Sequence, residues 1–230
     1  LIEVHGGGFI GGDKGAFRPS GEYYASRGVV VVAINYKLGR ADGSAPAFPE
    51  AVQDVYCAIR GIRARAATYH VDPDRIALRG GSAGATLVNM VALGGDDAPF
   101  NGGCNLGAGN SARVQAVVNY YGGADFEQFS LGGSDGLALF GPNPDAGLVL
   151  SSSPVNLVDA ADPPYVIGHG TADLTVPIDQ SRTLAAKLRS VGVEAQLVEV
   201  PGAPHGFIDN PFDGAYSRQV RCAEEALFAK

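Results

Sequence analysis

The sequence predicts an α/β fold, in which a mostly parallel central sheet is flanked by helices on both faces. Short apolar runs alternate along the chain with segments of helical periodicity, which is typical of successive βαβ units. The run GVVVVAI at residues 28–34 is β-branched and apolar almost throughout, as in a parallel strand buried on both faces. The chain has 230 residues, which suits a single domain over residues 1–230 better than two domains.

Short apolar runs bounded by turn-forming residues are predicted as strands. They lie at residues 1–4, 28–34, 75–79, 114–119, 164–168 and 194–200. Segments with apolar residues at helical spacing are predicted as helices. They lie at residues 49–68, 83–93, 178–191 and 213–229. Pro49 and Glu50 suit the first turn of the first helix, because proline lacks an N–H and a carboxylate faces the positive end of the helix dipole.

A long stretch at about 122–162 separates two of the predicted strands. It is predicted to be irregular, since it is rich in glycine, proline and serine. Long loops inside compact domains are usually functional, so we interpret this insertion as the wall or partial lid of a substrate pocket. The alternative is a loop attached to the core through its apolar residues. Those residues are Phe126, Phe129, Leu131, Leu137, Leu139, Phe140 and Leu148.

The composition favours a soluble protein that acts on a small neutral molecule. Hydrophobic residues make up 46% of the chain, which is enough for one core, and the formal net charge is -7. An acidic surface gives no general attraction for nucleic acid or anionic membranes, so neither is expected as a partner. No apolar run reaches the length of a membrane span, about 18 residues. Formation of a homo-oligomer is left open.

The cysteines Cys57, Cys104 and Cys222 are too few for a disulfide framework and lack the CxxC spacing of a metal site. A single bridge such as Cys57 to Cys104 is one alternative, but buried free thiols are favoured. No metal and no organic cofactor is predicted.

Two segments match the G-x-S-x-G pattern of a nucleophilic serine, one around Ser82 and one around Ser134. Ser82 follows the strand RIALR and opens the helix ATLVNMVAL. A strand–turn–helix of this kind is a nucleophile elbow, in which a strained turn exposes the serine. The helix N-terminus adds positive potential beneath a developing oxyanion. Ser134 lies in the long insertion with no strand before it, so Ser82 is the predicted nucleophile.

A run of glycines in His5-Gly6-Gly7-Gly8 follows the first predicted strand. Without side chains in the way, backbone N–H groups in such a run can turn toward a ligand. The N–H groups of Gly7, Gly8 and Ala83 are therefore the candidates for an oxyanion hole. His5 is interpreted as a brace for this loop rather than as a proton-transfer group.

The same loop formally matches the dinucleotide pattern G-x-G-x-x-G through Gly6, Gly8 and Gly11. Two observations count against a dinucleotide site. The segment GGDKGA is a poor start for a helix, so a pyrophosphate would lack its helix N-terminus. The next strand also ends in Asn35 rather than in the Asp or Glu that binds a ribose. A P-loop is excluded because Asp13 stands where that pattern requires lysine.

Among the four histidines, only His205 follows the last predicted strand, where the base of an α/β-hydrolase lies. His70 is expected at the surface, and His169, at the end of a strand, is expected to be structural. The acid should follow the preceding strand, which favours Asp173 in HGTADLTVP. Asp125 in GGADF is the alternative acid.

These residues form the predicted catalytic triad of an α/β-hydrolase fold. His205 would deprotonate Ser82, which attacks an ester carbonyl, while Asp173 fixes the tautomer of the histidine. Because the base must be neutral and an ordinary histidine titrates near 6.5, activity is expected to fall as the pH drops through about 6.5.

The motifs HGGGF, NYKL with FPEAVQD, DPDRIALRGGSAGA, HGTADLTVP and PHGF occur in an order that resembles bacterial α/β-hydrolase carboxylesterases. The similar groups are the hormone-sensitive-lipase-like esterases and the feruloyl and acetyl-xylan esterases, and the resemblance spans nearly the whole chain. It implies the same triad and oxyanion loop, and a preference for short acyl esters. Directly before the predicted nucleophile stands Gly81, where hormone-sensitive-lipase-like enzymes usually have an aspartate. This difference favours a resemblance to the feruloyl and acetyl-xylan esterases.

The chain starts at Leu1 without a methionine and enters a predicted strand at once. Members of the resembled family have two further strands before this point, and many have a lid segment. We therefore expect a fragment of a longer reading frame, with strand 28–34 left at a sheet edge that invites pairing. No targeting signal is visible, and the compartment is left open.

Phe9, Phe126 and Phe207 stand beside these motifs and are the candidate substrate-binding residues. The triad itself does not distinguish an esterase from an amidase, peptidase or arylformamidase, because only the pocket and the leaving group do so. A non-catalytic binding protein of the same fold is a third hypothesis. Such proteins usually lack a triad residue, whereas all three positions are filled here.

Overall fold

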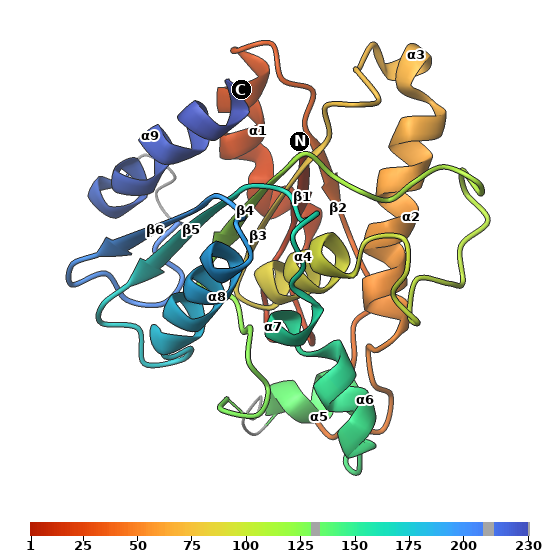
Figure 1. Cartoon of the computed structure of the whole chain (residues 1–230), viewed down its shortest axis with the longest axis vertical. Helices are drawn as coiled ribbons and strands as arrows, with labels where there is room; N and C mark the ends of the chain where they lie inside the picture. The colour runs from red at the N-terminus through yellow and green to blue at the C-terminus, as the bar shows by residue number, and fades with distance from the viewer. Residues whose placement is uncertain (130–133, 209–213, 230) are drawn as a thin grey trace.

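The computed structural model describes residues 1–129, 134–208 and 214–229. In these ranges, one sheet has the strand order β2-β1-β3-β4-β5-β6, and every neighbouring pair is parallel. Helices cover both faces of this sheet, which confirms the predicted fold class (Figure 1). The strands are β1 (Ile2–Val4), β2 (Val32–Ile34), β3 (Ala77–Gly81), β4 (Ala116–Tyr120), β5 (Tyr165–Gly170) and β6 (Ala195–Val200).

Two hydrophobic clusters attach the flanking helices to the two faces of the sheet. The larger cluster lies beneath α2, α4 and α8, and α4 is buried along nearly its whole length. The smaller cluster lies beneath α9, and α1 shares that face, where its Tyr24 ring lies 5.6 Å from the ring of Phe228. These helices are α1 (Arg18–Ala25), α2 (Glu50–Ala64), α4 (Ala83–Gly94), α8 (Asp179–Ser190) and α9 (Ala215–Phe228).

The helical segments near the N-terminus differ from the prediction. The helix predicted at 49–68 is divided at Arg65, which leaves the helical conformation between α2 and α3 (Ala66–Tyr69). A 3-10 helix, η1 (Lys14–Phe17), precedes α1, so the expectation of a poor helix start in this segment was wrong. The reason is Asp13, whose carboxylate accepts a hydrogen bond from the N–H of Gly15 at 2.8 Å and caps the helix.

The insertion at about 122–162 is helical in part, whereas it was predicted to be irregular. It contains α5 (Ser134–Phe140), α6 (Ala146–Ser152) and α7 (Pro154–Leu157). Helices α5 and α6 lie at the end of the molecule away from both termini (Figure 1). Asp145 caps α6 by accepting a hydrogen bond from the N–H of Leu148 at 2.8 Å. Leu131, one of the apolar residues of the prediction, lies outside the described residues.

Strand β2 lies at the edge of the sheet and is not buried on both faces. Its three residues are half-buried, and Val30, just before it, is 41% exposed. A hollow of about 700 Å³ opens beside the strand and is lined in part by Val29, Tyr69 and Phe228. An edge strand has a neighbour on one side only, so the apolar run at 28–34 is not enclosed.

Three charged side chains are buried between the sheet and the layer formed by α1 and α9. Arg79 of β3 bonds Glu3 of β1 through Nη1 and Glu224 of α9 through Nε, both at 2.8 Å, and none of the three side chains is more than 2% exposed. Ser20 and Tyr24 of α1 donate to the second oxygen of Glu3 and of Glu224, at 3.0 and 2.8 Å. Each buried charge is thus paired and hydrogen-bonded, as burial requires, and the cluster ties both helices to the sheet.

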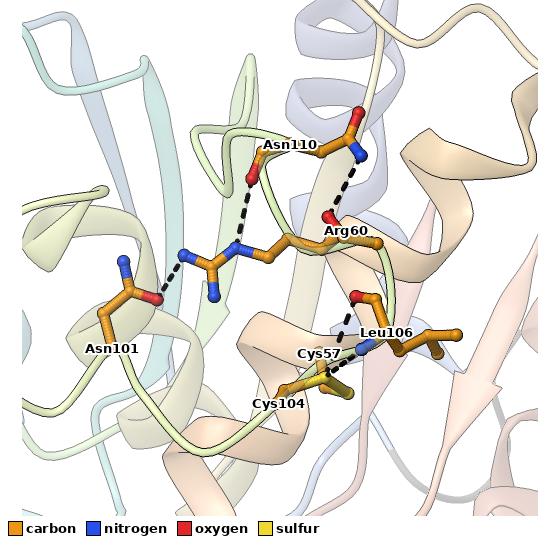
Figure 2. The surroundings of a disulfide bond; sticks show 7 residues. Cys57, Arg60, Asn101, Cys104, Leu106 and Asn110 are labelled. Atoms are coloured by element: carbon orange, nitrogen blue, oxygen red, sulfur yellow. Dashed lines mark hydrogen bonds between the residues drawn. A yellow bond between two sulfur atoms is a disulfide. The ribbon is translucent and has the colours of Figure 1, made fainter.

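A disulfide joins Cys57 of α2 to Cys104, which lies in the loop after α4 (Figure 2). The expectation of free thiols at these two positions was therefore wrong. The loop returns to α2 and brings the two Cα atoms to 5.6 Å, within the range that a disulfide spans. The remaining cysteine, Cys222, is free but exposed, where a buried thiol was expected.

The loop after α4 is also held by arginines of α2. Arg60 donates to the carbonyl oxygen of Asn110 at 3.1 Å and to Oδ1 of Asn101 at 2.6 Å (Figure 2). Arg63, one turn later, donates to the carbonyl of Arg113 at 2.7 Å. The disulfide thus strengthens an attachment that hydrogen bonds already define.

Reduction of the disulfide is expected to lower the free energy of unfolding by about 2–4 kcal/mol, because the bridge constrains the unfolded chain. The constraint spans 47 residues of sequence separation. Urea unfolding with and without dithiothreitol measures the change, and the variant Cys57→Ala/Cys104→Ala should match the reduced wild type. Cys222→Ala is the control and should unfold like the wild type. Equal stability of the oxidised and reduced wild type would contradict the expectation.

In the ranges 1–129, 134–208 and 214–229, no helix combines the length and the hydrophobicity that a membrane crossing requires.

Candidate active site

Ser82 lies in the sharp turn between β3 and α4. Its backbone has a φ of 54° and a ψ of -123°, and such a conformation costs about 1–3 kcal/mol in a residue other than glycine. Hydrogen bonds hold it on both sides. Its N–H donates to the carbonyl of Tyr120 at 2.9 Å, and its carbonyl accepts from the N–H of Thr86 at 3.0 Å. This strained turn at the end of a strand is the geometry that the elbow motif predicts.

The glycines around Ser82 permit close packing of backbone on backbone. A Cβ on Gly80 would lie 2.6 Å from the carbonyl of Gly84. A Cβ on Gly84 would collide with the carbonyl oxygens of Val4 and His5. Helix α4 therefore begins directly against the end of β1, which brings the elbow beside the glycine loop that follows β1.

The structure brings Ser82, His205 and Asp173 into one hydrogen-bonded line. Nε2 of His205 lies 2.9 Å from Oγ of Ser82, and its Nδ1 lies 2.7 Å from Oδ2 of Asp173. The three residues come from the elbow, from the loop after β6 and from the turn after β5. A carboxylate only accepts hydrogen bonds, so Nδ1 carries the proton and Nε2 presents a lone pair to the serine.

The carboxylate of Asp173 is fully buried and is surrounded by donors. Its Oδ1 accepts from the N–H groups of Thr175 and Val176 at 2.8 and 2.9 Å. Its Oδ2 lies 2.7 Å from His205 and 3.2 Å from His169. Burial alone would raise the pKa of this carboxyl, but the hydrogen bonds from both histidines and from Val176 outweigh it and hold the pKa well below its usual range. The group facing His205 is therefore an ionised carboxylate.

Asp125, the alternative acid, has a local role. Its Oδ1 accepts from the N–H groups of Glu127 and Gln128 at 3.0 and 3.2 Å, which stabilises the turn after β4. His70 is exposed at the C-terminal end of α3, as expected. Ser134 is the first residue of α5, and residues 130–133 before it lie outside the described part of the chain.

Gly7 and Gly8 form a tight turn after β1, with φ angles of 114° and 59° that favour glycine. The carbonyl of Gly7 accepts from the N–H groups of Ile10 and Gly11, both at 3.1 Å. Among the hydrogen bonds of the described residues, none has the N–H of Gly7, Gly8 or Ala83 as its donor. Donors of this kind beside an elbow suit an oxyanion hole, and that role stays a prediction.

His5 lies behind the glycine loop. Its ring stacks on that of Tyr36 with centroids 4.3 Å apart, and the Tyr36 hydroxyl donates to the His5 carbonyl at 3.0 Å. These contacts fix the end of β1, from which the loop departs. They agree with the interpretation of His5 as a brace for the glycine loop.

Phe9, Phe126 and Phe207 are all buried. Phe9 is 1% exposed and packs in the larger core cluster, while Phe126 packs on Phe140 with ring centroids 5.8 Å apart. Phe207 packs on Tyr121, with ring centroids 5.3 Å apart. Contact of these three residues with substrate stays a prediction.

Sequence reasoning missed two side chains beside these groups. The ring of Tyr121 lies 4.6 Å from that of His205, and its place directly after β4 was a signal that could have found it. Asp135 of α5 lies against the glycine loop, because a Cβ on Gly8 would be 2.7 Å from its Oδ1. No sequence pattern connects Asp135 to that loop. Over the described ranges, no three histidine, cysteine, aspartate or glutamate side chains are grouped as a metal site would require.

A parallel sheet with a strained serine elbow at the end of a central strand defines an α/β-hydrolase. The chain belongs to the BD-FAE family, whose model matches residues 1–188, and with it to the α/β-hydrolase carboxylesterases. The resemblance drawn from the order of the motifs is confirmed.

Solved structures of esterases share this fold. An acetyl ester-xyloside bifunctional hydrolase from Caldicellulosiruptor lactoaceticus superposes with a TM-score of 0.86 at 27% identity, covering 99% of this chain and 81% of that one. The esterase Est2 of Thermogutta terrifontis, with propionate bound, has a TM-score of 0.80 at 29% identity, covering 99% and 82% of the two chains. Esterase LipQ of Mycobacterium tuberculosis is 33% identical over 224 residues, which is 90% of this chain and 50% of LipQ. The chain spans about half the length of the curated relatives it matches.

Proposed function

We propose that this chain is a serine esterase, a single catalytic domain over residues 1–230 that hydrolyses short-chain carboxylic esters without a cofactor. One observation carries the proposal, namely the hydrogen-bonded line of Ser82, His205 and Asp173 at a strained elbow beside the glycine loop. This geometry has a nucleophile, a neutral base and an ionised acid in the order that acyl transfer requires.

The proposed reaction has two halves. Nε2 of His205 takes the proton of Ser82 as Oγ attacks the ester carbonyl, and the negative oxygen is stabilised by the N–H groups of Gly7, Gly8 and Ala83. The alcohol leaves with the proton from His205. A water molecule then attacks the acyl-enzyme by the same route and releases the acid. Asp173 stays ionised throughout and stabilises the imidazolium.

Short acyl groups are proposed as the substrates. Acetyl esters come first, because one relative is an acetyl ester hydrolase and another binds propionate. Feruloyl esters are a second candidate, suggested by Gly81 before the nucleophile. The insertion supports a pocket wall, since Asp135 of α5 lies against Gly8. A carboxylate at this wall would disfavour anionic substrates and accept hydrogen bonds from hydroxyl groups of the alcohol.

Turnover of p-nitrophenyl acetate, butyrate and octanoate tests the proposal, beside p-nitroacetanilide as the matched amide. We expect the acetate and butyrate to be hydrolysed faster than the octanoate, and the amide at least about a hundredfold more slowly than the acetate. A comparable rate for the amide would favour an amidase instead. Absence of turnover of all four by a folded chain would favour a binding protein of the same fold.

A further inference from the structure

His169 is buried directly behind the acid of the triad. It lies near the end of β5 and is fully buried. Its Nε2 is 2.9 Å from the carbonyl oxygen of Val176 and 3.2 Å from Oδ2 of Asp173. Its Nδ1 is 2.7 Å from Oγ of Ser181, which belongs to α8. The side chain thus connects a strand, the turn after it and a helix.

The partners of His169 indicate which of its ring nitrogens carries a hydrogen. A carbonyl oxygen only accepts hydrogen bonds, so Nε2 must carry the hydrogen. That N–H points at the Val176 carbonyl and is shared with Oδ2 of Asp173. Nδ1 then has the lone pair and accepts the hydroxyl proton of Ser181. These partners match the Nε2–H tautomer of His169, and both of its ring nitrogens are held by hydrogen bonds.

We propose that His169 is a positioning residue of the active site, which rests on the proposed function above. Its Nε2–H lies 3.2 Å from Oδ2 of Asp173, the same oxygen that faces His205, and holds that oxygen in place. The hydrogen-bonded line then continues beyond the triad, from Ser82 through His205 and Asp173 to His169 and Ser181. In this arrangement α8 sets the orientation of a carboxylate that in turn sets the orientation of the base.

Packing alone does not account for this arrangement, because both imidazoles approach the same carboxylate oxygen. The N–H groups of Thr175 and Val176 hold only Oδ1. Without His169, the only partner of Oδ2 among these groups is His205, the residue that must be oriented. The imidazole of His205 would then lose its alignment with Ser82 in the transition state. Substrate binding does not involve this contact, so the loss is expected in kcat and not in KM.

The test compares His169→Leu with His169→Gln, using p-nitrophenyl butyrate as substrate. The leucine variant lacks a donor, whereas the glutamine amide can donate to Asp173 from the place of Nε2. We expect kcat to fall about 10–100-fold in the leucine variant, with KM within about twofold of the wild type. Glutamine should restore kcat to within about fivefold of the wild type. All rates are taken per active serine, titrated to completion with diisopropyl fluorophosphate and counted by mass spectrometry.

Asn89→Leu is the matched control, because Asn89 is a fully buried polar side chain that bonds Asn119 and not the triad. It should lower the melting temperature and leave kcat per titrated serine unchanged. A leucine variant at position 169 with wild-type kcat per titrated serine, or a loss that glutamine does not restore, would overturn the role of His169. A wild type that neither turns over the ester nor reacts with the fluorophosphate would instead overturn the proposed function, and this role with it.

Discussion

Ser82→Ala is expected to lower kcat/KM for p-nitrophenyl acetate by about 10⁴-fold or more. The substitution removes the hydroxyl oxygen that is proposed to form the acyl-enzyme, and the remaining donors and binding contacts should supply only a small part of the rate enhancement. Steady-state hydrolysis at pH 8, with the ester's spontaneous rate subtracted, measures the effect. Alanine keeps the Cβ at a position whose backbone φ is 54°, so the fold should change little.

Ser134→Ala is the matched control for this experiment. Both serines stand in a G-x-S-x-G segment, but Ser82 follows strand β3 and is hydrogen-bonded to His205, whereas Ser134 begins α5 in the insertion. The control should retain the wild-type rate. Retention of more than about a hundredth of the activity in Ser82→Ala, after purification from contaminating esterases, would mean that another nucleophile carries the reaction.

Arg79→Leu is expected to lower the free energy of unfolding by about 3–5 kcal/mol. The guanidinium pairs with Glu3 and Glu224, both fully buried, and its loss leaves two buried carboxylates without this cationic partner. Without Arg79, protonation of these two carboxyl groups costs less free energy than burying them as unpaired charges. Protonation is easier at low pH, so the loss of unfolding free energy should be smaller at pH 5 than at pH 8. Urea unfolding at the two pH values measures both effects.

Arg182→Ala provides the comparison. Arg182 also bonds two carboxylates, those of Asp179 and Glu199, but its side chain is 48% exposed. Solvent screens an exposed pair, so the expected loss is within about 1 kcal/mol. If the two arginine variants lost similar unfolding free energy, burial would not be the reason that the Arg79 ion pairs stabilise the fold.

The strands were predictable because each is a short apolar run. The residues at which they end were harder to predict. Strand β3 extends through Gly80 and Gly81, which looked like turn residues. Gly80 in fact pairs with Val4 on one side and Asn119 on the other, because close packing against α4 requires a glycine within the strand. The helices of the insertion were missed for a different reason. They are seven residues long or shorter, and helices of that length are stabilised by tertiary contacts rather than by their own sequence pattern.

The order of motifs along the chain was enough to select Ser82, Asp173 and His205, and the structure places them within hydrogen-bonding distance. The contacts around these three residues depend on tertiary packing. His169 stands four residues before Asp173 and was expected to be structural, since nothing in its sequence context indicates which atoms its ring contacts. Asp135 reaches the glycine loop only because α5 folds across it.

The link between Cys57 and Cys104 also bears on how the protein is made and where it is stable. Disulfides persist in oxidising surroundings, such as the periplasm or the extracellular medium, and are kept reduced by the thiol pools of the cytosol. Recombinant material from a reducing host would carry two thiols on α2 and its neighbouring loop, with a lower melting temperature than material secreted or refolded in air. Batches from the two sources should therefore differ in heat tolerance while sharing the same active site.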